Sequence, residues 1–145
     1  MTSPNPRSRR LAMKLRPKED ARDWVEEAKK FYTASGKRIA LAEFSNPNGG
    51  FVKDDLYIFV LGSKGTMLAH GGNEKFIGEV FIHLKDVDGK HFIKDIVSTA
   101  NAKGSGWVDY KWFHPVTKER LRKTVYFEKI DDIIICSGVY GKDAD

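Results

Sequence analysis

The sequence predicts an α+β fold in which one long helix precedes a five-stranded antiparallel sheet, with a helical connection between the second and third strands. Three observations lead to this prediction. Apolar residues recur at helical spacing in residues 19–35 and 90–104. Five other segments are rich in β-branched and aromatic residues, as strands are. The links between several of these segments are too short for a parallel return, which needs about a dozen residues.

The long helix is expected over residues 19–35. One side of it collects apolar residues, and the opposite side is charged. The apolar positions include Trp24, Val25, Ala28, Phe31 and Tyr32. Gly36 follows as a C-terminal cap, because glycine readily takes the left-handed conformation that ends many helices. Residues 37–46 are expected to continue as a second, short helix that "NPNGG" ends.

Two strands and a helix come next. Residues 55–61, "DLYIFVL", and 66–71, "TMLAHG", are predicted to pair as a hairpin around the turn "GSKG". Residues 73–90 show no clear period and are expected to form an irregular connection. Helical spacing returns in residues 90–104 and ends at Gly104.

Three strands complete the predicted sheet, at residues 106–114, 121–130 and 132–140. The links "PVTKER" and "DD" join them, and such short links make consecutive strands antiparallel neighbours. Aromatic residues fall on both faces of the first of these strands, so both of its faces are expected to be covered.

The net charge of +5 comes from the start of the chain. Residues 1–18 hold six of the 25 Lys and Arg residues and no acidic residue, so the rest of the chain carries 19 basic and 20 acidic side chains. We expect residues 1–18 to be a disordered basic tail and residues 19–145 to be one domain. The nearly neutral body argues against nucleic-acid binding, which draws its affinity from basic surface. No stretch approaches the roughly 20 apolar residues that cross a bilayer.

No motif in the sequence predicts an enzyme, a metal site or a cofactor. The four histidines show no metal-ligand spacing. Cys136 stands alone in an apolar strand, which predicts packing rather than nucleophilic or disulfide chemistry. The chain contains no phosphate-binding loop, dinucleotide fingerprint or nucleophile elbow.

Five stretches of this sequence resemble the single Cache domain family in their residues and in their order along the chain. They are "GGFVKDDLYIFVLGSKGTMLAHGGNEKFIGE", "LKDVDGKHFIKDIV", "GWVDYKW", "HPVTK" and "KTVYFEKIDDIIICSGVY". The likeness runs from about Val25 to Tyr140 and implies a PAS-like extracytoplasmic sensor fold with a role in signal transduction or chemotaxis. With no output domain attached, the chain is similar to the free-standing relatives. The family implies a periplasmic or extracellular location, although the sequence shows no clear signal peptide and a cytoplasmic location stays open.

The resemblance also implies a ligand and a site. The ligand would be a short organic acid such as pyruvate, acetate, propionate or lactate. The residues carried over as ligand contacts are Tyr57, His70, Tyr110, Lys123 and Tyr126, with Trp112 as a wall of the pocket.

Strand alternation leaves the pocket cation open. Lys123 and Tyr126 lie on opposite faces unless their strand starts late or bulges between them. Arg122 shares the face of Tyr126 and stands where relatives often have Pro, so either base is a candidate. His70 ends its strand, where it either borders the pocket or caps the turn.

A second hypothesis is a PAS-like protein-interaction or dimerisation module with a vestigial pocket. A cavity filled by side chains, together with a homodimer that forms with rising concentration, would favour this hypothesis over a ligand sensor.

Overall fold

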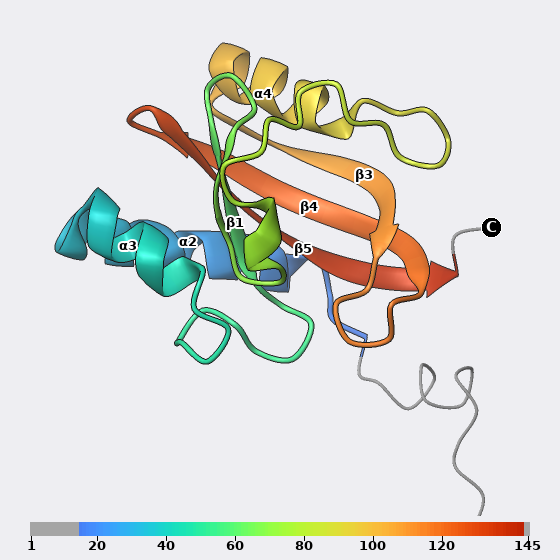
Figure 1. The fold of residues 1–145 in the computed structure, drawn as a ribbon, viewed down its shortest axis with the longest axis horizontal. Coiled ribbons are helices and arrows are strands. Elements are labelled where there is room, and N and C mark those ends of the chain that lie inside the picture. The colour runs from blue at the N-terminus through green and yellow to red at the C-terminus, as the bar shows by residue number, and fades with distance from the viewer. Residues whose placement is uncertain (1–14, 144–145) are drawn as a thin grey trace, which may run out of the picture.

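The computed structural model describes residues 15–143 (Figure 1). The fold is the α+β fold that the sequence predicts, with helices before the sheet and a helical connection between its second and third strands. In chain order the elements are α2 (Glu19–Ser35), α3 (Lys37–Phe44), β1 (Ile58–Gly62), β2 (Met67–His70), the 3₁₀ turn η1 (Glu74–Phe76), α4 (Phe92–Lys103), β3 (Ser105–Phe113), β4 (Arg120–Ile130) and β5 (Ile133–Asp143).

The five strands form one antiparallel sheet in the order β2-β1-β5-β4-β3. The hairpins β1–β2, β3–β4 and β4–β5 are those that the short links predict. The remaining pair joins the first strand, β1, to the last, β5, and no link in the sequence predicts it. This pair makes β5 the central strand of the sheet.

The sheet separates two apolar cores (Figure 1). Helices α2 and α3 cover one face, and α4 with the connection before it covers the other. Strand alternation sorts the side chains between these cores. In β1, for example, Ile58 and Val60 belong to the α2 core, whereas Phe59 and Leu61 belong to the α4 core.

Helix α2 lies on the sheet through one buried stripe, at Ala21, Val25, Ala28 and Tyr32. This spacing keeps the stripe on one side of the helix. The Tyr32 hydroxyl donates a hydrogen bond to Asp131 in the β4–β5 turn (2.7 Å), and this bond, followed by burial, raises the pKa of Tyr32 to about 12. The C-terminal end of α2 is thereby attached to the hairpin of the two longest strands.

The connection between β2 and α4 runs along the outer edge of β2. Met67 donates its N–H to the carbonyl of Glu79, and Gly78 donates to the carbonyl of Met67 (both 2.8 Å). Phe76, Phe81, Ile82 and Leu84 from the connection pack against the α4 core. The connection therefore covers a sheet edge and also forms one side of that core.

Two expectations concern the ends of the chain and membrane crossing. Residues 1–14 of the tail expected at 1–18 lie outside the described residues. Within residues 15–143, no helix has the length and apolar character needed to cross a bilayer.

Candidate functional site

A buried lysine defines the candidate site. The side chain of Lys123, in β4, points to the α4 face of the sheet and the residue is 1% exposed. Its Nζ donates a hydrogen bond to the Tyr57 hydroxyl (2.7 Å). Four aromatic rings surround the ammonium group at 4.5–5.9 Å from their centroids, and we call them the aromatic cage. The cage consists of Tyr57, Phe59, Tyr110 and Tyr140.

No carboxylate compensates this charge within the part of the chain that the structure describes. None of the ion pairs formed there involves Lys123, although Lys29, Lys37 and Lys111 all have acidic partners. An ammonium group has three N–H donors, and Lys123 uses one of them. Ring faces attract a cation but accept hydrogen bonds poorly, so the site retains unused donors and an uncompensated positive charge.

The hydroxyl groups of the cage form a chain of hydrogen bonds. Tyr140 donates to the carbonyl of Phe113 (3.1 Å), so the Tyr57 hydroxyl donates to Tyr140 (3.3 Å) and accepts from Lys123. Burial, followed by the neighbouring Tyr57, raises the pKa of Tyr140 well above its usual value. Tyr140 therefore stays neutral and does not supply the missing anion.

His70 is a neutral neighbour of the ammonium group. Its Nδ1 accepts N–H bonds from Gly72 (3.1 Å) and Asn73 (2.8 Å), so the ring proton resides on Nε2. Burial, followed by the charge of Lys123, lowers the pKa of His70 to about 3. The two roles left open by the sequence thus coexist, because His70 caps its turn and also lines the cavity beside Lys123.

Two neighbouring hollows lie at this site, a narrow inner cavity and a wider outer hollow. The inner cavity, which Lys123 and His70 line, measures about 20 Å³, or room for roughly one water molecule. An outer hollow of about 180 Å³ shares His70, Phe76 and Trp112 with it. Apolar side chains make up most of the inner wall: Phe59, Met67, Phe76, Phe81, Leu84, Phe92, Ile93 and Trp112.

Tyr110 and Trp112 form one side of the inner cavity, from alternate positions of β3. The Tyr110 ring stacks on Phe92 of α4, with centroids 3.9 Å apart. Trp112 lies between the rings of Phe92 (5.4 Å) and Phe76 (6.2 Å). Trp112 borders both hollows, and its role as the wall of a ligand pocket stays a prediction.

Tyr126 does not join this group. The irregularity in β4 falls between Leu121 and Lys123, so alternation continues unbroken from Lys123 to Tyr126. The Tyr126 side chain therefore lies on the α2 face, where its hydroxyl donates to Glu128 (3.1 Å). Arg122 is exposed, so Lys123 is the base that lines the cavity.

The expectation that both faces of β3 are covered is wrong for the face opposite the cavity. Trp107 is 37% exposed and Phe113 is 52% exposed. Trp107 packs against Tyr126, and the ammonium group of Lys18 lies over its ring. Helix α2 contacts β4 and β5 and does not extend over all of this outer strand.

Comparison with known proteins identifies the family. The profile of the family described as single Cache domain 2 matches residues 18–145, which is nearly the whole chain. The chain belongs to the single Cache domain family.

Known relatives of this Cache domain include chemotaxis proteins. The methyl-accepting chemotaxis protein McpP of Pseudomonas putida is 34% identical over 92 residues, covering 62% of this chain but 16% of that much longer protein. A methyl-accepting chemotaxis protein from Vibrio parahaemolyticus has a solved structure with a TM-score of 0.73 at 20% identity, over 84% of this chain and 86% of that chain. A Cache chemosensory domain, whose structure was described as the basis for carboxylic acid recognition, has a TM-score of 0.66 at 25% identity, over 86% and 88%. This Cache domain is thus a ligand-binding sensor domain of the type found in chemotaxis receptors, and its family is not one of enzymes.

Three residues of the Lys123 environment in this Cache domain are absent from the sequence-based site: Phe59, Gly138 and Tyr140. Tyr140 pairs with Lys123 in the β4–β5 register. The sequence contains a signal for it, because alternation in the last strand puts Cys136, Gly138 and Tyr140 on one face. A glycine inside a strand often marks a place where another group approaches the backbone closely.

Gly138 provides that space. A Cβ atom at this position would lie 2.7 Å from Cγ2 of Val125 and 2.8 Å from Cε of Lys123, both well inside normal contact distance. We expect Gly138→Ala to lower the free energy of unfolding by about 1–3 kcal/mol, as overpacking does, and to displace the ammonium group from the cage. Urea unfolding measures the first effect.

Gly141→Ala in the same strand is the matched control for Gly138→Ala. Its added Cβ would meet neighbouring atoms only at 3.8 Å and beyond, which is ordinary contact. Equal stability of the two variants would contradict the expected overpacking at Gly138.

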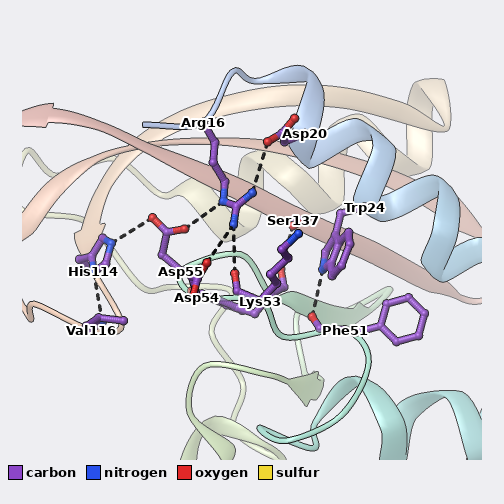
Figure 2. A network of polar contacts seen from close by, with 11 residues as sticks. Arg16, Asp20, Trp24, Phe51, Lys53, Asp54, Asp55, His114, Val116 and Ser137 are labelled. Atoms are coloured by element: carbon purple, nitrogen blue, oxygen red, sulfur yellow. Dashed lines mark hydrogen bonds and ion pairs between the residues drawn. The ribbon is translucent and has the colours of Figure 1, made fainter. Parts of the chain in front are cut away.

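A polar network fastens the turn that precedes Tyr57 in this Cache domain (Figure 2). Arg16, just before α2, donates to Asp55 (3.1 Å) and to the carbonyl of Lys53 (3.3 Å). Asp55 also bonds to Nε2 of His114 at the end of β3 (3.1 Å). Burial alone would raise the pKa of Asp55, but the bonds from His114 and Arg16 outweigh it and hold this pKa below its usual value.

Two further bonds hold the chain on either side of that turn, and Figure 2 shows the one between Trp24 and Phe51. The Trp24 indole donates to the carbonyl of Phe51 (3.0 Å), and the Ser137 hydroxyl donates to the carbonyl of Tyr57 (2.8 Å). The position of the Tyr57 ring in the cage therefore depends on contacts from α2, β3 and β5 together.

Proposed function

We propose that this sensor domain binds a short monocarboxylic acid, of the class of pyruvate, acetate, propionate and lactate, with its carboxylate against Lys123. One observation carries the proposal: a fully buried ammonium group lines a cavity, with two N–H donors unused and no acidic partner within residues 15–143. Burying an unpaired charge is costly, and a ligand carboxylate supplies the counter-charge.

The energies are sufficient for a sensor. Hydrogen bonds that involve a charged group contribute about 1.5–3 kcal/mol each, and Lys123 offers its two unused donors to one carboxylate. A micromolar dissociation constant corresponds to about −8 kcal/mol. The rest of the affinity comes from the apolar inner wall, which suits the short hydrocarbon part of such an acid.

The comparisons support this ligand class and a sensory role. The Cache domain that was described for carboxylic acid recognition has a similar fold over 86% of this chain. The relative in Pseudomonas putida is a methyl-accepting chemotaxis protein. The proposal therefore includes a location outside the cytoplasm and a part in chemotaxis-type signalling.

Binding requires the inner cavity to widen, because about 20 Å³ does not admit an acid of four to six heavy atoms. Phe76 and Trp112 stand between the inner cavity and the outer hollow. Phe76 belongs to the short η1 turn in the connection rather than to the sheet. An outward shift of this connection would join the two spaces into one pocket.

The same small volume favours a second candidate function, an interaction or dimerisation module whose pocket is vestigial. Sedimentation velocity over a range of protein concentrations tests it. A dimer that forms with rising protein concentration would favour this candidate, provided that calorimetric titration with the acids gives no binding heat.

The proposed ligand class is tested by calorimetric titration of the whole chain with acetate, propionate, pyruvate and lactate. We expect at least one of these acids to bind and to raise the melting temperature. Propionamide, which has the shape of propionate without its charge, should not bind, because the counter-charge for Lys123 drives binding. Absence of binding by all four acids, or equal binding of the amide, would contradict the proposal.

A further inference from the structure

A second polar group faces the cavity beside Lys123. The Nε2 atom of His70 makes no hydrogen bond within residues 15–143 and is not fully enclosed, although the residue is only 5% exposed. His70 lines both the inner cavity and the outer hollow. A buried side chain with an unused polar atom at a cavity is a candidate for ligand contact.

Backbone hydrogen bonds determine which ring nitrogen of His70 carries the proton. Two N–H groups, from Gly72 and Asn73, point at Nδ1 of His70, so Nδ1 must be the acceptor and Nε2 the donor. His114 repeats the arrangement, since its Nδ1 accepts N–H bonds from the residues two and three positions on. In His114, however, Nε2 is already bonded to Asp55. His70 has the same fixed tautomer with its donor still available.

The donor lies within reach of a ligand that Lys123 holds. Both groups line the inner cavity, and both lie against the same two rings. The Lys123 ammonium group is 4.5 Å from the Tyr57 centroid and 5.0 Å from that of Phe59, and the His70 ring is 4.9 Å and 5.9 Å from the same centroids. Because this cavity is small and both groups line it, an acid whose carboxylate binds Lys123 extends its carbon 2 into the space that His70 also lines.

We propose that His70 makes the site prefer acids with a hydrogen-bond acceptor on carbon 2, the 2-oxo and 2-hydroxy acids, over alkanoic acids of the same length. This inference rests on the proposed function. An oxygen on carbon 2 accepts a hydrogen bond from Nε2, whereas a methylene group offers this donor no acceptor. Sites with a fixed donor discriminate strongly against ligands that cannot accept from it.

The test compares pyruvate with propionate, which has a methylene group where pyruvate has its keto oxygen. Calorimetry on the whole chain should give a dissociation constant for pyruvate roughly tenfold lower than for propionate, as one buried hydrogen bond implies. In His70→Asn the ratio should fall to about one, with propionate still bound. Asparagine can accept the same two backbone N–H bonds, but its shorter side chain does not reach the position of Nε2.

His83→Asn is the matched control, because His83 is exposed and outside the cavity. It should leave the ratio unchanged. Equal affinities for the two acids in the unmodified chain would overturn the inference while leaving the proposed function intact. Failure of both acids to bind would overturn both.

A second measurement does not depend on any variant. With ¹⁵N-labelled histidine, the Nε2 proton of His70 should become protected from solvent exchange when pyruvate is added and not when propionate is added. Protection by both acids, or by neither despite binding, would overturn the inference.

Discussion

Lys123→Met is expected to abolish binding of carboxylic acids and to stabilise the ligand-free domain by about 1–2 kcal/mol. Replacing a buried charged group by an apolar side chain of similar length removes the cost of keeping that charge out of water. Part of the gain is offset, because the cation–π contacts and the bond to Tyr57 are lost as well. Urea unfolding without ligand measures the stability, and calorimetry measures the binding.

Arg122→Met is the control for this substitution. Arg122 precedes Lys123, is exposed and does not line the inner cavity. Its replacement should change stability by less than about 0.5 kcal/mol and should leave binding unchanged. Normal acid binding by Lys123→Met would show that the ammonium group is not the anchor of the ligand.

Acidification from pH 6.5 to pH 5 is expected to cost the domain about 2 kcal/mol of stability through His70 alone. The pKa of His70 is about 3 in the folded chain and 6.5 as a free side chain. Between these two pKa values the His70 side chain binds a proton in the unfolded chain but not in the folded chain. Unfolding therefore becomes more favourable as the pH falls. Chemical unfolding at a series of pH values gives this dependence.

The variant His70→Asn should lose this part of the pH dependence, whatever its absolute stability. Exposed His83→Asn should retain it, because His83 lies outside the cavity and its replacement leaves the surroundings of His70 unchanged. Asp55 and Asp86, whose pKa values are lowered in the fold, add their own acid sensitivity only near and below pH 4. Identical pH profiles for the unmodified chain and His70→Asn would contradict the assignment.

The fold could be predicted from the sequence wherever local rules act. Helical spacing gives α2 with its observed bounds, and short links give three of the four strand pairs. The pairing of β1 with β5 could not be predicted in this way, because it joins distant parts of the chain and depends on both cores forming. Local patterns alone do not encode such a contact.

The candidate site was predictable only in part, for a related reason. Alternation correctly separates Lys123 from Tyr126, but it cannot tell which of the adjacent bases, Arg122 or Lys123, lies inside. That choice depends on rings from β1, β3 and β5 that gather around one ammonium group. The resemblance supplied Tyr57 and Tyr110 of that cage, whereas Tyr140 becomes evident only from the register of β5 with β4.

The anchoring of Arg16 has a practical consequence for truncation of the chain. A fragment trimmed to the start of α2 would keep every helix and strand named above, and would look complete by secondary structure. It would nevertheless lose the Arg16 guanidinium, whose hydrogen bonds hold Lys53 and Asp55 at the N-terminal end of α2. The smallest piece in which ligand binding can be judged fairly therefore begins no later than residue 16.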